Sequence, residues 1–256
     1  MTAGSWRTPA RAGTVIGSFA LAACWWRGGF EPKNFKSSED LFAASMHEFQ
    51  VGHLGNSSQG FERLTLDLPA RDPLLPLSFW YLAQTYDRRG DHLIAAQNFQ
   101  RIAESFPDDS LADDALLAAG KAYAQMWSKP ELDPQYGLLA QGTLRGVLSS
   151  YPETALRDQV VKEIERIDEL LATKDYDTAL HYMRRKGYDS AIIYLKDVMK
   201  SYPATGHARL AGLKLLEAYH AIKYAEESHE LCSTLTKGYP QDPEVRQACA
   251  LPPPSR

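Results

Sequence analysis

An all-α solenoid of about five stacked helical hairpins, with one lengthened helix, is the fold class that the 256-residue sequence predicts. Four segments with helical apolar periodicity end in an aromatic residue followed by proline: Phe106-Pro107, Tyr151-Pro152, Tyr202-Pro203 and Tyr239-Pro240. Proline cannot continue a helix and disfavours helical backbone in the residue before it, so each pair marks a helix end. Counted from Pro69, the closing prolines are 38, 45, 51 and 37 residues apart. Intervals of this size are typical of hairpin repeats that bury their apolar faces against their neighbours.

The first 23 residues have the features of a secretory signal peptide. Arg7 and Arg11 precede an uncharged, mostly small and apolar run over residues 12–23, too short for the ~20 residues of a transmembrane helix. The run ends in Leu21-Ala22-Ala23-Cys24, which resembles the bacterial lipobox, where the cysteine thiol is acylated before cleavage. We therefore expect a lipoprotein signal peptide over residues 1–23 and lipidation of Cys24. An ordinary signal peptide with a chance cysteine is the alternative.

Residues 24–37 contain Gly28-Gly29 and Pro32 without periodicity, which predicts a tether between the lipid and the fold. A helical pattern begins after Ser37, with two acidic residues in its first turn, as expected at a helix start. The closing prolines then divide the chain into N-terminal repeats 1–3 over residues 38–152 and C-terminal repeats 4–5 over residues 153–243. The proline-rich end predicts a flexible tail over residues 244–256.

The second hairpin carries the motif of the tetratricopeptide repeat (TPR) at its own spacing. Small residues stand where two antiparallel helices would cross closely, and large apolar residues fill the seam on either side. Glycine permits the turn between the helices. The motif positions are Phe79, Leu82, Ala83, Tyr86, Gly90, Ala95, Phe99, Ile102 and Pro107.

The two long intervals have separate origins. The halves of the third hairpin are out of phase by 8 residues, and Pro130 and Pro134 lie in the excess, so residues 127–134 are predicted to form an inserted loop. Residues 154–185 contain neither proline nor glycine and keep their apolar periodicity. We therefore expect one helix of about thirty residues there, joining the N-terminal repeats to the C-terminal repeats.

Three cysteines leave two after lipidation of Cys24. Cys232 and Cys249 then form a candidate disulfide, which an oxidising periplasm would permit. Cys232, however, falls at a helix position that normally holds a buried apolar side chain, so an inert buried thiol is the alternative.

Signatures of catalysis are missing from the sequence. The seven histidines include no zinc-binding His-Glu-x-x-His pair, and no glycine-rich phosphate loop or nucleophile elbow occurs. We therefore expect no catalytic residue, no metal site and no cofactor. The net charge of −4 provides no electrostatic reason to expect nucleic acid. Extended repeats present surface more readily than an enclosed pocket, so a binding scaffold is favoured over an enzyme.

In TPR arrays, the concave groove is lined mainly by the first helix of each hairpin, on the face opposite the second helix. In the second hairpin, Trp80 could either line this groove or pack against the first hairpin. A groove tryptophan beside charged residues would suit an extended, aromatic-rich peptide. The candidate partner-binding residues are Trp80, Gln84, Asp87 and Arg88 in the second hairpin, and Tyr176, Leu180, Met183 and Arg184 in the fourth.

The order of these features resembles the BamD (YfiO/ComL-type) family of outer-membrane lipoproteins from Cys24 to about Pro243. Particularly similar are Leu132-Asp133-Pro134 before a helix and the stretch from Tyr182 through Gly187-Tyr188 to Tyr202-Pro203. The resemblance implies a non-enzymatic, lipid-anchored subunit of the β-barrel assembly machinery, at the periplasmic face of the outer membrane. It implies that the C-terminal repeats bind the barrel-forming, BamA-like subunit. It also implies that the N-terminal repeats receive unfolded outer-membrane protein clients.

Another periplasmic TPR lipoprotein, one that coordinates cell-envelope proteins with peptidoglycan enzymes, is the alternative function. Proteins of that type usually carry a coiled coil before the repeats, and residues 25–37 are too short for one.

Overall fold

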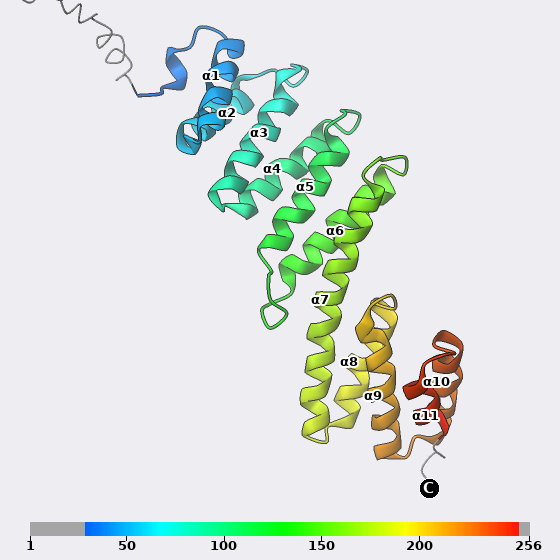
Figure 1. Cartoon of the computed structure of the whole chain (residues 1–256). Coiled ribbons are helices and arrows are strands. Elements are labelled where there is room, and N and C mark those ends of the chain that lie inside the picture. Colours follow the sequence, from blue (N-terminus) through cyan, green and yellow to red (C-terminus); the bar gives the residue numbers. More distant parts are fainter. Residues whose placement is uncertain (1–28, 251–256) are drawn as a thin grey trace, which may run out of the picture.

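The computed structural model describes residues 29–250, which form eleven α-helices and one short 3₁₀ helix and contain no strand. Figure 1 shows the helices as antiparallel hairpins stacked in one continuous row from α1 to α10, with α11 beside the last hairpin. The predicted all-α hairpin solenoid is confirmed. The bounds are η1 Pro32–Asn34, α1 Ser38–Val51, α2 Leu54–Asp67, α3 Leu74–Arg89, α4 His92–Ser105, α5 Ala112–Gln125, α6 Gln135–Ser150, α7 Arg157–Arg184, α8 Tyr188–Ser201, α9 Gly206–Ile222, α10 Ala225–Gly238 and α11 Pro243–Ala250.

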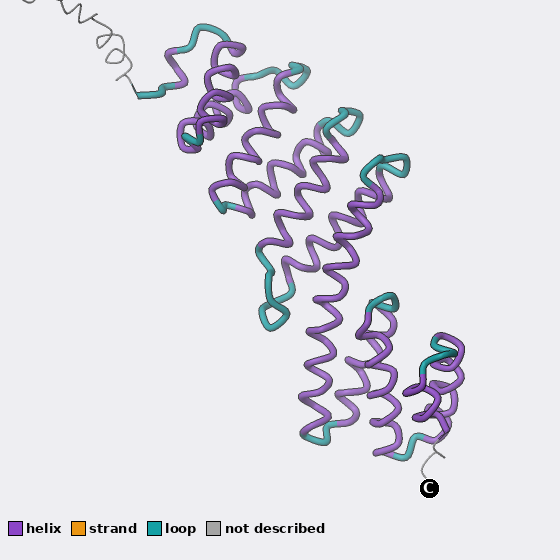
Figure 2. Tube along the Cα trace, viewed as in Figure 1, coloured by secondary structure: helices purple, strands orange, loops and turns teal. Residues whose placement is uncertain are grey.

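The aromatic–proline pairs end the second helix of four hairpins. Helices α4, α6, α8 and α10 each stop one residue before the aromatic residue, whose own N–H still donates to the carbonyl four residues back. That residue leaves helical backbone because the following proline excludes it. Turns between hairpins lie along one edge of the row and turns within hairpins along the other (Figure 2).

Close helix crossings are made at small residues. Ala83 and Ala95 are completely buried where α3 meets α4. A Cβ atom on Gly120 of α5 would lie 2.6 Å from Cγ of Leu144 in α6, so only glycine allows that approach. Between α3 and α4, Gly90 takes a left-handed φ of 85° and reverses the chain.

The long helix is α7, which has 28 residues. It belongs to both halves of the array: its N-terminal half packs beside α6, and its C-terminal half beside α8 and α9. Asp168 of α7 accepts hydrogen bonds from Gln141 and Arg145 of α6. The predicted lengthened helix is present and joins the two sets of repeats.

The inserted loop before α6 is fastened to α7. Trp127 is 2% exposed, and its indole N–H donates to the carbonyl of Leu132. From α7, Nζ of Lys174 donates to the carbonyls of Pro130 and Leu132, at 3.1 and 2.9 Å. The two irregularities of the repeat spacing therefore contact each other.

Both ends of the array differ from expectation. Residues 29–37 are not wholly a tether, because η1 contacts α2, and Phe30 and Phe35 pack together on the core. The tail expected over residues 244–256 is wrong for its first part, since Pro243–Ala250 form α11. Asp242 accepts from the N–H groups of Glu244 and Val245 and so starts this helix, while Val245 is fully buried. The proposed signal peptide, Cys24 and the last six residues lie outside the described residues.

The structure contains the candidate disulfide, and Cys232 is not an inert buried thiol. Cys232 of α10 and Cys249 of α11 are bonded, with Cα atoms 5.5 Å apart. The bond secures the last helix to the last hairpin.

Candidate partner-binding site

Three helices of the C-terminal half surround an open cleft of about 440 Å³. Tyr176 enters it from α7, Leu210 and Leu213 from α9, and Ala248 from α11. These side chains are partly buried, and burial raises the pKa of the Tyr176 hydroxyl above its usual value. The cleft therefore offers an apolar floor with a protonated tyrosine hydroxyl at neutral pH.

Charged groups form the rim of this cleft. Lys214 is paired with Glu217 at 2.7 Å, and this hydrogen bond raises the pKa of Lys214. Arg209 bridges Asp242 and Glu244 at 3.0 and 2.8 Å, and its bond to Glu244 raises the pKa of Arg209. Both cations remain charged at physiological pH, so the rim carries fixed charges of both signs.

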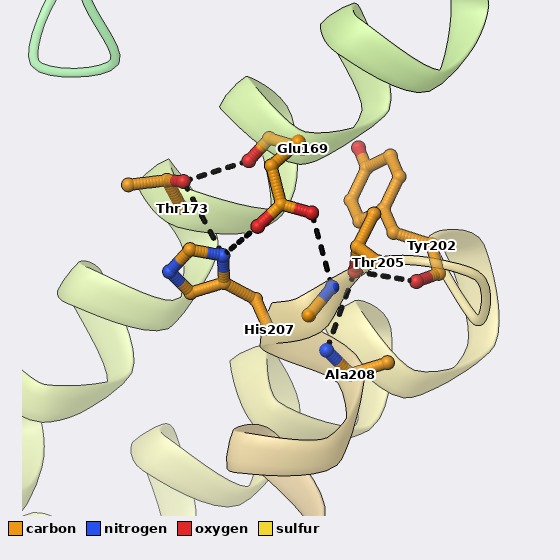
Figure 3. Close-up of polar contacts among 7 residues, drawn as sticks. Glu169, Thr173, Tyr202, Thr205, His207 and Ala208 are labelled. Atoms are coloured by element: carbon orange, nitrogen blue, oxygen red, sulfur yellow. Dashed lines mark hydrogen bonds and ion pairs between the residues drawn. The ribbon is translucent and has the colours of Figure 1, made fainter.

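A polar cluster between α7 and the start of α9 holds these two helices together (Figure 3). Nδ1 of His207 donates to Oε1 of Glu169 at 2.5 Å, and the N–H of Gly206 donates to Oε2 at 3.0 Å. Thr205 caps α9 by accepting from the N–H of Ala208. A carboxylate at a helix N-terminus is stabilised by the unpaired N–H groups and the helix dipole. Glu169 of α7 therefore holds the N-terminus of α9 against α7.

The four candidate partner-binding residues of the fourth hairpin do not share one surface. The ring of Tyr176 lies 5.4 Å from that of His207 on the α9 side. Arg184 instead lines a second cleft, of about 400 Å³, together with Lys174 and residues 130–131. Leu180 is half-buried, and Met183 packs against the core. Of the four, only Tyr176 enters the 440 Å³ cleft.

The expected residues of the second hairpin mostly make contacts within the chain. Trp80 packs edge-to-face on Phe99, with ring centroids 5.2 Å apart, so it contacts the second helix of its own hairpin. This contact tests neither of its two expected positions. The guanidinium of Arg88 lies 3.8 Å from the ring centroid of Phe49 and also donates to the Phe49 carbonyl.

Asp87 accepts from His92 at 2.7 Å and from Gln125 at 3.4 Å. Gln84 is partly exposed. Asp87 and Arg88 therefore link α3 to its neighbours.

Sequence reasoning missed the cleft residues of α9 and α11. Leu210, Leu213 and Glu217 follow one another at three- and four-residue spacing, a helical face distinct from the one that buries Leu215 and Leu216. That second apolar face was a usable signal. The sequence contained no comparable signal for Ala248, because residues 244–256 were expected to form a flexible tail.

Within the described residues, no cluster of three or more histidine, cysteine or acidic side chains could hold a metal ion. Among the same residues, no helix combines the length and the apolar character needed to cross a bilayer.

Stacked helical hairpins define a TPR-like solenoid as the class. The family model for YfiO, described as an outer membrane lipoprotein, matches residues 36–235. The chain belongs to this family. It is also similar to the outer membrane protein assembly factor BamD of Rickettsia prowazekii (strain Madrid E), with 24% identity over 119 residues. That match covers 46% of the chain and 47% of the relative, so the chain spans about half the length of the curated relative.

Solved structures of TPR proteins share this fold. A TPR repeats protein from Bacteroides fragilis NCTC 9343 aligns over 84% of the chain and 97% of its own length, with 12% identity and a TM-score of 0.52. A thermophilic TPR protein from Thermus thermophilus covers 84% and 97% likewise, with 16% identity and a lower TM-score of 0.36.

Proposed function

We propose that the protein is a lipid-anchored, non-enzymatic scaffold subunit of the outer-membrane β-barrel assembly machinery, facing the periplasm. It binds the barrel-forming, BamA-like subunit and receives unfolded outer-membrane protein clients. The observation that carries this proposal is the family match over residues 36–235, which includes all five hairpins except the end of α10. Similarity to a protein named for outer-membrane protein assembly supports the same role.

The cleft between α7, α9 and α11 is the proposed contact site for the barrel-forming subunit. Leu210 and Leu213 offer partly exposed apolar surface there, and the rim charges can align a partner through pairs that fit only one register. The surface of α3 around the partly exposed Gln84 is proposed for clients, because polar and aromatic side chains suit an extended chain.

Replacing Leu213 with glutamate should abolish capture of the barrel-forming subunit, because it places a charge against the apolar floor of the cleft. The full-length protein is affinity-tagged, expressed in its own cells and purified from detergent-solubilised envelopes. The wild-type protein should co-purify with a large barrel protein that carries soluble repeat domains, and the variant should recover at least about tenfold less of it.

Leu66→Glu is the matched control, since Leu66 is 80% exposed on α2, away from the cleft. It should capture as much barrel protein as the wild type does. If the wild-type protein recovers peptidoglycan enzymes and no barrel protein, the assembly role is wrong and the envelope-coordinator alternative stands. If Leu213→Glu captures normally, the role survives but the contact site is misplaced.

Lipidation is tested separately at Cys24. Cys24→Ala should move the protein from the membrane fraction to the soluble periplasmic fraction, because the acyl chains that anchor it would be absent. Fractionation with immunodetection measures the shift, and Cys249→Ala, which leaves the junction intact, is the control. A Cys24→Ala protein that stays in the membrane fraction contradicts the lipid anchor.

A further inference from the structure

Helix α9 also borders a groove on the face opposite the cleft at Tyr176. It has a volume of about 440 Å³ and is bounded by α8, α9 and α10. Leu215 and Tyr219 of α9 line it, whereas Leu213 and Lys214 line the first cleft. Residues 213 and 215 are about 200° apart around a helix. Helix α9 therefore separates two grooves that partners could occupy at the same time.

The floor of this second groove is apolar. Leu215, Tyr219 and Leu231 are 2%, 4% and 8% exposed, and Met199 is partly buried beside them. A bulky apolar side chain entering the groove would lie on already ordered side chains, so it would not have to immobilise them on binding.

The two walls carry opposite charges. Lys196 and Lys200 stand on α8, four residues apart and both exposed. Glu227 and Glu230 stand on α10, three residues apart and also exposed. These spacings place each pair on one face of its helix. The groove is therefore an apolar floor between a row of lysines and a row of glutamates.

Nothing in the described part of the chain joins the two walls. Among residues 29–250, no ion pair links Lys196 or Lys200 to Glu227 or Glu230. The ammonium of Lys196 lies 5.7 Å from the ring centroid of Tyr219. Helix dipoles explain Lys200 in the last turn of α8 and Glu227 in the first turn of α10. They do not explain Lys196 and Glu230, which stand further inside their helices.

We propose that this groove docks an amphipathic helix of a partner protein, with carboxylates along the edge facing α8 and lysines or arginines along the edge facing α10. Charge complementarity to both walls selects this occupant, and apolar side chains on its inner face contact Leu215, Tyr219 and Leu231. Turning the helix end for end exchanges its two edges, so the walls also determine its direction. The inference is independent of the assembly role proposed above.

The test uses the full-length protein in detergent and a fluorescein-labelled synthetic helix of about five turns. The helix has leucines on one face, glutamates on one edge and lysines on the other. Fluorescence anisotropy should show saturable binding that weakens at 1 M salt, where the Debye length falls to about 3 Å. A peptide of identical composition with its charges mixed on both edges should bind at least about tenfold more weakly. Equal binding of the two peptides overturns the proposal.

Charge inversion identifies the walls. Lys196→Glu with Lys200→Glu should weaken binding of the peptide with glutamates on one edge and lysines on the other at least about tenfold, because both walls become acidic. Adding Glu227→Lys and Glu230→Lys should restore binding, since the reversed peptide again meets complementary walls. Lys129→Glu with Lys162→Glu, two exposed sites outside the groove, has the same net charge as the first variant and should bind as the wild type does.

Three further measurements keep the result decisive. If the inverted variants lose their helical circular dichroism, Lys196→Gln with Lys200→Gln removes the wall charge without placing carboxylates at the end of α8. This variant should weaken binding about threefold to tenfold, and unchanged binding would overturn the proposal. Leu213→Glu should bind the peptide normally, because it lies on the other face of α9. Dimerisation of the wild-type protein that the wall inversion abolishes would show that the occupant is a second copy, which also overturns the proposal.

Discussion

Gly137→Ala is expected to lower the free energy of unfolding by about 1–3 kcal/mol, the usual cost of overpacking a close-packed core. A Cβ atom at this position would lie 2.2 Å from Cε3 of Trp127. The indole cannot yield easily, because Trp127 is 2% exposed and its N–H is bonded to the Leu132 carbonyl. Urea denaturation followed by circular dichroism measures the change, provided that the transition is a single one.

The same substitution elsewhere in α6 provides the control. Gly142 has no atom within 4 Å of its would-be Cβ, so Gly142→Ala should stabilise the helix by up to about 1 kcal/mol through its propensity alone. Opposite signs at two glycines of one helix would locate the effect in the contact with Trp127. Equal effects would contradict it.

Trp127→Ala tests the contact from the other side. It should cost about 3–5 kcal/mol through the cavity that it leaves. In this background Gly137→Ala should become nearly neutral, because the ring that its Cβ would meet is gone. A cost of Gly137→Ala that persists without the indole would mean that α6 excludes a side chain there for another reason.

Local rules were sufficient to predict the hairpins. Helical backbone is disfavoured for the residue before proline, so Phe106, Tyr151, Tyr202 and Tyr239 marked helix ends without any tertiary information. The predicted start of α1 is likewise confirmed by Ser37, whose hydroxyl accepts from the N–H of Asp40. These signals act within about four residues, and the sequence displays them directly.

Contacts between distant segments could not be predicted in the same way. Lys174 appears in the sequence as one more charge on a long helix, and only the folded chain brings its ammonium to the carbonyls of Pro130 and Leu132. The contact of Trp80 with Phe99 was likewise not predicted. Which neighbour a helical side chain contacts depends on the angle between hairpins, and the spacing of motif residues does not specify that angle.

Helix α11 shows a further limit. Its eight residues bury only Val245, too weak an apolar pattern to indicate a helix beside the proline-rich end. An isolated helix of this length is unstable. Its stability must therefore come from contacts with α9 and α10, of which the disulfide is the strongest single constraint.

Cys232→Ser combined with Cys249→Ser is therefore expected to detach α11 while leaving the other hairpins folded. Closing a loop over a sequence separation of 17 residues is worth about 3 kcal/mol in the chain-entropy account. Amide hydrogens of α11 should then exchange about 100-fold faster, since each 1.4 kcal/mol is a factor of ten. Hydrogen exchange with mass spectrometry measures this, and trypsin should cleave after Arg246 more readily.

The effect should depend on the bond and not on either thiol alone. Cys249→Ser by itself should match the double variant, because one missing cysteine already opens the loop, and treatment of the wild-type protein with dithiothreitol should do the same. Ser233→Ala, at an exposed position beside Cys232, should leave the exchange of α11 unchanged. Protection of α11 that survives loss of the bond would show that Val245 and the ion pairs of Arg209 with Asp242 and Glu244 hold the helix unaided. The cleft at Tyr176 would then keep its α11 wall under reducing conditions, whereas detachment would open the cleft on that side.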